Sequence, residues 1–99
     1  MKLKITKRAL RRTKIVDAWW REHRLAAPDV FSDELAWAKR ELLSRPDLAP
    51  RYVTASGKIF RRLLLPTSEQ HVYYTVHRDV GLVIVHTVWG ARRGRGPKL

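Results

Sequence analysis

Apolar positions in the first 24 residues change from a strand-like to a helix-like spacing. Residues 2–6 (KLKIT) alternate polar and apolar side chains, which predicts a short strand. The stretch from 7 to 24 contains neither glycine nor proline, and its apolar residues recur at helical intervals. These residues are Ala9, Thr13, Val16 and Trp20, with Ile15 and Trp19 widening the stripe. We expect an amphipathic helix whose first turn is capped by the hydroxyl of Thr6.

A second helical pattern follows after a short link. Its apolar face consists of Phe31, Leu35, Ala38 and Leu42. Pro28 suits the first helical position, and Asp29 would then place a negative charge in the first turn. Pro46 ends the helix, because the residue before a proline is pushed out of helical geometry. Two such helices joined by a short link predict an antiparallel hairpin.

The second half of the chain is typical of strands. Residues 47–57 contain Pro50 and Gly57 and are expected to be an irregular connection. Three strands are predicted after it, at 58–65, 71–78 and 82–89, where Val, Tyr and other β-forming residues concentrate. Short links between them favour a three-stranded antiparallel meander.

The predicted order is strand, helix, helix and three strands (β-α-α-β-β-β) in a single domain spanning 1–99. We expect an α+β fold of two layers, with the N-terminal strand joining a small, mainly antiparallel sheet. The helical hairpin would cover one face of this sheet. Residues 91–99 are expected to form a basic C-terminal tail. No further element remains to cover the other face, so we expect that face to meet solvent or a partner.

The net charge of the chain limits the classes of partner that it is expected to bind. The 99 residues include 21 Lys and Arg against 9 Asp and Glu, which leaves a formal net charge of +12. The excess gathers in residues 2–14, 61–62 and 92–98 and favours a polyanionic or acidic partner. With no cysteine, disulfides, cysteine-ligated zinc and a cysteine nucleophile are excluded. We expect no cofactor and no metal. No apolar run approaches the ~20 residues that span a bilayer, and a cytoplasmic location is expected.

Two neighbouring arginines stand out in the predicted middle strand. Arg61 and Arg62 must point to opposite faces, because successive strand side chains alternate. At least one is expected on the open face, where its guanidinium can bind a phosphate or carboxylate. The alternative is an internal salt bridge to one of three carboxylates: Glu34, Glu41 or Asp47.

Histidines and tryptophans supply the other candidates. Among the four histidines, His71 and His77 share strand parity with Tyr73 and Thr75 and are expected on one face. Trp20 and Trp37 are expected in the core. Trp19 is adjacent to Trp20 and must point elsewhere, whereas Trp89 can serve either the core or a partner.

Four segments in this order resemble the RelE/ParE family of toxins from bacterial type II toxin–antitoxin systems. They are residues 31–35 (FSDEL), 61–66 (RRLLLP), 72–76 (VYYTV) and 88–97 (VWGARRGRGP). The resemblance covers nearly the whole chain. It implies the same α+β fold and one of two activities. RelE-like members cut messenger RNA in the ribosome, and ParE-like members poison DNA gyrase.

The candidate residues differ between the two activities, and the resemblance itself implies a sheet arginine, Arg61 or Arg62, and an arginine after the last strand, Arg92 or Arg93. For RelE-like RNA cleavage the candidate catalytic residues are Arg61, Arg62, His71, Arg92 and Arg93. For target or partner binding they are Trp19, Trp89, Arg92, Arg93 and Arg95. The chain lacks the tyrosine that RelE-like enzymes place after the last arginine, and has Gly90 where related chains often have histidine. Because arginine is a poor proton-transfer group, these departures favour the ParE-like activity.

The resemblance also implies a cognate antitoxin. An acidic antitoxin segment, bound over the helical hairpin and the sheet, would complement the charge and form a toxin–antitoxin hetero-oligomer.

Two other possibilities for the function stay open. One is a non-catalytic basic module that binds nucleic acid, and the other is an inactive family member retained as an antitoxin partner.

Overall fold

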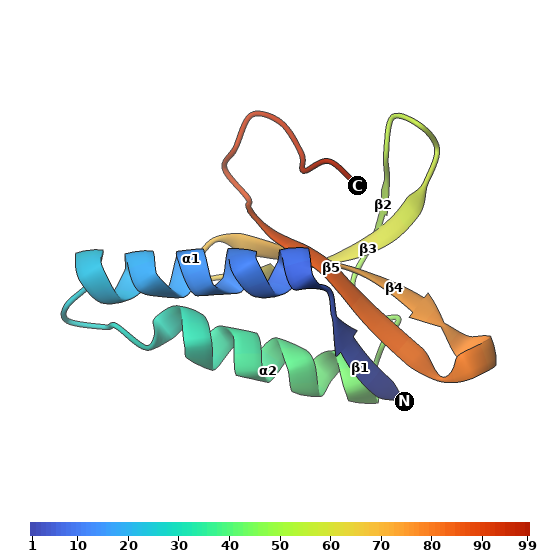
Figure 1. The fold of residues 1–99 in the computed structure, drawn as a ribbon, viewed down its shortest axis with the longest axis horizontal. Coiled ribbons are helices and arrows are strands. Elements are labelled where there is room, and N and C mark those ends of the chain that lie inside the picture. The colour runs from blue at the N-terminus through green and yellow to red at the C-terminus, as the bar shows by residue number, and fades with distance from the viewer.

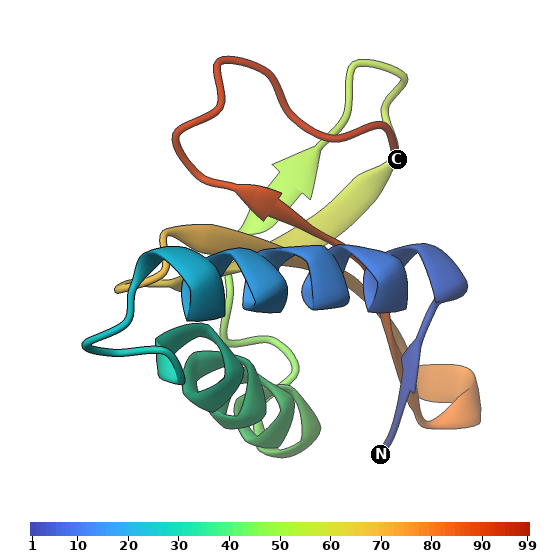
Figure 2. The same ribbon diagram turned by 60° about the vertical axis from the view of Figure 1, so that its left-hand side comes forward.

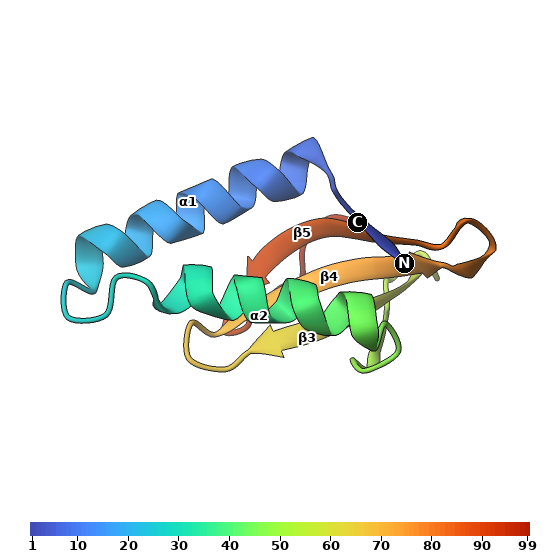
Figure 3. The same cartoon turned by 90° about the horizontal axis from the view of Figure 1, so that it is seen from below.

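A computed structural model describes residues 1–99 and confirms the α+β architecture (Figure 1). The elements are β1 (Lys2–Ile5), α1 (Lys7–His23), α2 (Val30–Ser44), β2 (Arg51–Val53), β3 (Ile59–Leu65), β4 (Gln70–His77) and β5 (Leu82–Gly90). A 3-10 turn over Arg78–Val80 separates β4 from β5. The strands form one five-stranded sheet in the order β1-β5-β4-β3-β2. Both helices pack on the same face of this sheet (Figure 3).

The two helices begin in different ways. In α1 the Thr6 hydroxyl accepts a hydrogen bond from the Ala9 amide at 3.1 Å, as the sequence predicts. The predicted start of α2 is wrong, because the helix begins at Val30 and Pro28 lies before it. Asp29 occupies the N-cap position, yet its side chain caps no amide.

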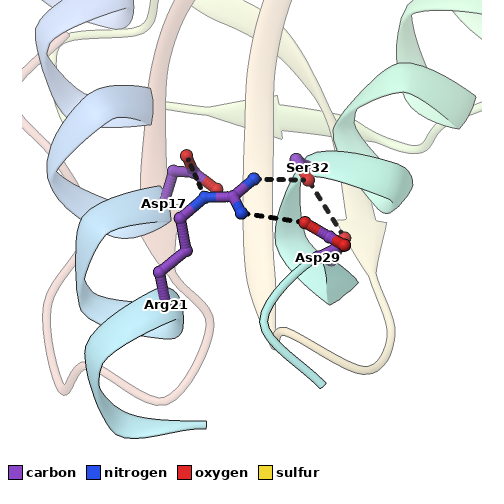
Figure 4. A network of polar contacts seen from close by, with 4 residues as sticks. All are labelled: Asp17, Arg21, Asp29 and Ser32. Atoms are coloured by element: carbon purple, nitrogen blue, oxygen red, sulfur yellow. Dashed lines mark hydrogen bonds and ion pairs between the residues drawn. The ribbon is translucent and has the colours of Figure 1, made fainter. Parts of the chain in front are cut away.

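The Asp29 carboxylate instead takes part in a polar network between α1 and α2. Arg21 of α1 pairs with Asp29 at 2.9 Å and with Asp17 at 3.0 Å (Figure 4). Its guanidinium also lies 3.5 Å from the hydroxyl of Ser32. This exposed network joins the C-terminal half of α1 to the first turn of α2 and aligns the hairpin.

The sheet is mixed, because β1 runs parallel to β5 while every other pair is antiparallel. The three-stranded meander of β3, β4 and β5 is confirmed. The prediction that residues 47–57 are wholly irregular is wrong, since β2 forms there and pairs with β3. Three residues are too few to show an alternating pattern, and only the pairing with β3 defines this edge strand.

The core lies between the helices and one face of the sheet. From α2 it includes Phe31, Ala38 and Leu42, all fully buried. From the sheet it includes Leu63, Leu65, Val72, Tyr74, Val83, Val85 and Val88. Trp20 and Trp37 pack against this cluster and are partly buried, as expected. Ile15 and Trp19 do not widen the buried stripe, because both side chains are exposed.

The expectation of an uncovered second face is wrong in part. The C-terminal tail, residues 91–99, bends back toward the β2–β3 hairpin on the side away from α2 (Figure 2). The Trp89 indole donates to the carbonyl of Arg95 at 2.8 Å, and Pro97 is buried. Lys58 donates to the carbonyl of Leu99 at 3.4 Å. The tail therefore covers part of the face that the helices leave open.

Candidate functional site

The two strand arginines have different surroundings. Arg61 faces the helix side near the edge of the sheet, where it donates to the carbonyl of Ala49 at 2.7 Å and approaches Asp47 at 3.6 Å. Asp47 is one of the three internal partners considered from the sequence. Arg62 points to the open face and forms no ion pair. Its guanidinium lies 4.8 Å from the centroid of the Tyr52 ring. Arg61 is thus a structural residue, and Arg62 is available for a ligand.

Five of the sequence candidates meet in one hollow on the open face. They are Arg62, His71, Trp89, Arg93 and Arg95. The hollow encloses about 190 Å³. Its walls come from β2, β3, β4, the end of β5 and the tail, so it exists only because the tail folds back. We call it the sheet hollow.

His71 is the titratable group of the sheet hollow. Burial lowers the pKa of its imidazole, and the positive charge of Arg62 lowers it further. A histidine with a lowered pKa is neutral near pH 7 and can accept a proton. The buried Tyr73 ring lies edge-on to His71, with centroids 6.0 Å apart. The hollow thus combines a neutral imidazole with guanidiniums that can stabilise negative charge.

Three more polar side chains share the open face beside the sheet hollow. The Thr75 hydroxyl lies 2.7 Å from Nε2 of His77 and 2.8 Å from Nε2 of His86. His71, Tyr73, Thr75 and His77 thus share one face, as their parity predicts. Burial lowers the pKa of His86, and repulsion from His77 and Arg8 adds to this effect.

Because the pKa values of His71 and His86 are lowered, we expect acid to destabilise the protein. The pKa values of His71 and His86 are lowered on folding, so below the unfolded pKa of about 6.5 the unfolded chain binds protons that the folded chain resists. The free energy of unfolding is expected to be highest above that pH and to fall as the pH drops toward the folded pKa values. Urea titrations across pH 5 to 8 measure this slope. Replacing both histidines by glutamine should flatten it, and an unchanged slope would contradict the assignment.

The remaining two candidates lie in a separate groove. Trp19, with 43% of its surface exposed, and Arg92 line a groove of about 690 Å³ between α1 and the β3–β4 turn. Arg92 pairs with Glu69 at 2.6 Å. Arg93 contributes to both this groove and the sheet hollow. The predicted binding residues are therefore divided between two neighbouring surfaces that share one arginine.

Tyr52 and Arg12 belong to these surfaces but were not among the site residues predicted from the sequence. Tyr52 lines the sheet hollow from β2, a strand that the local pattern does not reveal. Arg12 belongs to the basic cluster of residues 2–14. It is half-buried, donates to the carbonyl of Val88 at 3.4 Å and lies 5.5 Å from the Trp89 ring. The basic composition of the helix was the only signal for Arg12.

At Gly96 the tail lies directly against the hydroxyl of Tyr52. The backbone there passes so close to the Tyr52 hydroxyl that an added methyl group would overlap it. We expect Gly96→Ala to displace the tail at a cost of about 1–3 kcal/mol. The matched control is Gly94→Ala, since nothing lies within 4 Å of a methyl group there. Limited proteolysis should cleave the tail faster only in the Gly96 variant, and equal rates in the two variants would contradict this contact.

No group of three or more His, Cys, Asp or Glu side chains is placed to hold a metal ion. None of the helices has the length and apolar character required to cross a membrane. Comparisons with protein-family models, with curated proteins and with solved structures found no match to this chain.

Proposed function

We propose that this protein is the toxin of a type II toxin–antitoxin system and arrests growth in the cytoplasm by poisoning DNA gyrase. The proposal joins the family resemblance of the sequence to the basic surface of the fold. An acidic cognate antitoxin neutralises the toxin by covering that surface.

The observation that carries the proposal is the composition of the sheet hollow. Guanidiniums of Arg62, Arg93 and Arg95 surround a space of about 190 Å³ that the tail encloses. Two phenols line the hollow: the Tyr73 ring is only 1% exposed, and the half-buried Tyr52 has its hydroxyl against the tail at Gly96. A surface of charged and aromatic side chains is sufficient to bind a protein target. Cleavage of RNA requires in addition an accessible proton donor and room for a nucleotide.

A second candidate function is RelE-like cleavage of messenger RNA. It is favoured by one specific observation: His71 lines the sheet hollow together with Arg62, and burial lowers the pKa of its imidazole. In this function His71 takes the proton of a ribose 2′-hydroxyl, and the 2′-oxygen then attacks the adjacent phosphorus. The bond from phosphorus to the 5′-oxygen breaks, the leaving oxygen takes a proton from water, and Arg62 stabilises the charge on the phosphate. The tail would have to open to admit the substrate.

Two assays of purified protein separate these functions. In the first, we expect inhibition of gyrase supercoiling and accumulation of cleaved DNA–gyrase complexes. In the second, messenger RNA on ribosomes is expected to stay intact. Untouched supercoiling would reject the gyrase proposal. Ribosome-dependent cleavage that His71→Ala and Arg62→Ala abolish would establish the second function in its place.

The antitoxin proposal is tested in the cell. Co-expression with the product of an adjacent acidic reading frame is expected to restore growth. The two proteins should then purify together as a hetero-oligomer. Growth arrest that no neighbouring product relieves would reject the antitoxin proposal.

A further inference from the structure

The groove along α1 is lined by more arginines and tryptophans than the sheet hollow. Its lining includes four arginines and two tryptophans: Arg12, Arg24, Arg92, Arg93, Trp19 and Trp20. We call it the α1 groove. From Arg12 to Arg24 the helix extends for about 18 Å at its usual rise per residue. The groove is therefore an elongated surface suited to an extended chain.

Most of its positive charge has no partner. Arg92 pairs with Glu69, whereas Arg12, Arg24 and Arg93 form no ion pair. Burial lowers the pKa of Arg12, and repulsion from Arg93 and Arg8 lowers it further. Holding such cations together destabilises the free protein, and a bound polyanion would remove that repulsion.

The C-terminal end of the groove offers flat stacking surfaces. Trp19 stacks on His23 with centroids 4.7 Å apart and planes 12° from parallel. Trp20 meets Trp19 edge-on at 5.9 Å. The guanidinium of Arg24 lies 5.0 Å from the Trp19 centroid. A nucleic-acid base can extend such a stack on either a ring or a guanidinium plane.

Two residues in the lining of the groove, Ser68 and Gln70, have a buried oxygen with no hydrogen-bond partner. Ser68 is only 6% exposed, and its buried Oγ has no hydrogen-bond partner. Oε1 of Gln70 is likewise buried and unpartnered. Such oxygens are unusual in folded proteins and are satisfied when a donor arrives. Nucleic-acid bases carry N–H donors of the kind that such oxygens accept.

We propose that the α1 groove binds single-stranded nucleic acid, with Trp19 stacking on a base and Arg12 and Arg24 contacting phosphates. A duplex would keep its bases paired and out of reach of Trp19. An acidic peptide would satisfy the charges and leave the stacking surface unused. This proposal is independent of the toxin proposal, because binding is measured with neither gyrase nor ribosomes present.

Titration of a labelled single-stranded oligothymidylate, followed by fluorescence anisotropy, tests the proposal. We expect Trp19→Ala to weaken binding on the order of tenfold. Arg12→Ala and Arg24→Ala should each reduce the slope of log affinity against log salt by about 0.7. The matched control is Arg40→Ala, which removes the same charge from an exposed position on α2, away from the groove. It should leave affinity nearly unchanged.

A strand of equal length with abasic sites isolates the stacking contribution. It should bind the native protein about as weakly as oligothymidylate binds the Trp19 variant. Equal affinity for both strands would overturn the stacking assignment. Losses from Arg40→Ala that match those from Arg24→Ala would show a diffuse charge effect and overturn the groove. Polyglutamate that binds more tightly than the oligonucleotide would assign the groove to an acidic protein instead.

Discussion

A chain carrying Arg93→Glu is expected to permit growth under expression conditions in which the native chain arrests it. Arg93 lies where the sheet hollow and the α1 groove meet, and its guanidinium is 4.2 Å from the centroid of the Trp89 ring. A glutamate there removes this cation–π contact and reverses the charge at the centre of both surfaces. Like charges facing an acidic target cost several kcal/mol of binding, on the order of a thousandfold in affinity.

The fold should tolerate this change. Arg93 is exposed, and Arg12 would exchange a repelling neighbour for an attracting one. Plating efficiency under induction measures the effect, and circular dichroism verifies that the variant is folded. The control is Arg40→Glu on α2, which changes the net charge equally and should arrest growth like the native chain. Full arrest by a folded Arg93→Glu chain would show that neither surface carries the activity.

Phe31→Ala is expected to cost about 3–5 kcal/mol of folding stability. The Phe31 side chain is fully buried at the start of α2, within the cluster that joins both helices to the sheet. Removing the ring leaves a cavity that the surrounding helices and strands can fill only in part. A domain of this size has an unfolding free energy of roughly 5–15 kcal/mol, so the loss is a large share of the total.

Urea denaturation of the purified variant measures this cost. Leu43→Ala is the control on the same helix, because Leu43 is 40% exposed and its truncation should change stability by at most about 0.5 kcal/mol. A cost below about 1 kcal/mol at Phe31 would contradict the packing of α2 on the sheet.

The helices and the long strands were predictable because each is long enough to show its own period. The stripe of Ala9, Thr13 and Val16 is buried as its spacing predicts. The strands of the meander agree with the predicted ranges to within a residue or two. By contrast, β2 has only three residues. It is a strand because it pairs with β3, and no local sequence pattern predicts that pairing. The start of α2 was misplaced by two residues: Asp29 is the N-cap, and its carboxylate pairs with Arg21 of α1 across the hairpin, a contact that no local pattern contains.

The candidate site was predictable in its residue types and in part of its geometry. Strand alternation alone placed Arg61 and Arg62 on opposite faces, since it is a local property of extended backbone. Tertiary structure decided which of them stays available. The loop after α2 brings Asp47 and the carbonyl of Ala49 to Arg61 and leaves Arg62 without an ion pair.

By itself the sequence determined the α+β order of elements, the positive charge and the face shared by His71, Tyr73 and Thr75. Each of these follows from composition or from a short-range period. Only the tertiary structure decided that residues 91–99 return over the open face and enclose the sheet hollow. Only the tertiary structure brought Arg12 beside Trp89, 77 positions later in the chain. Such contacts depend on how distant segments pack, because a glycine-containing tail has no periodic pattern that predicts where it lies.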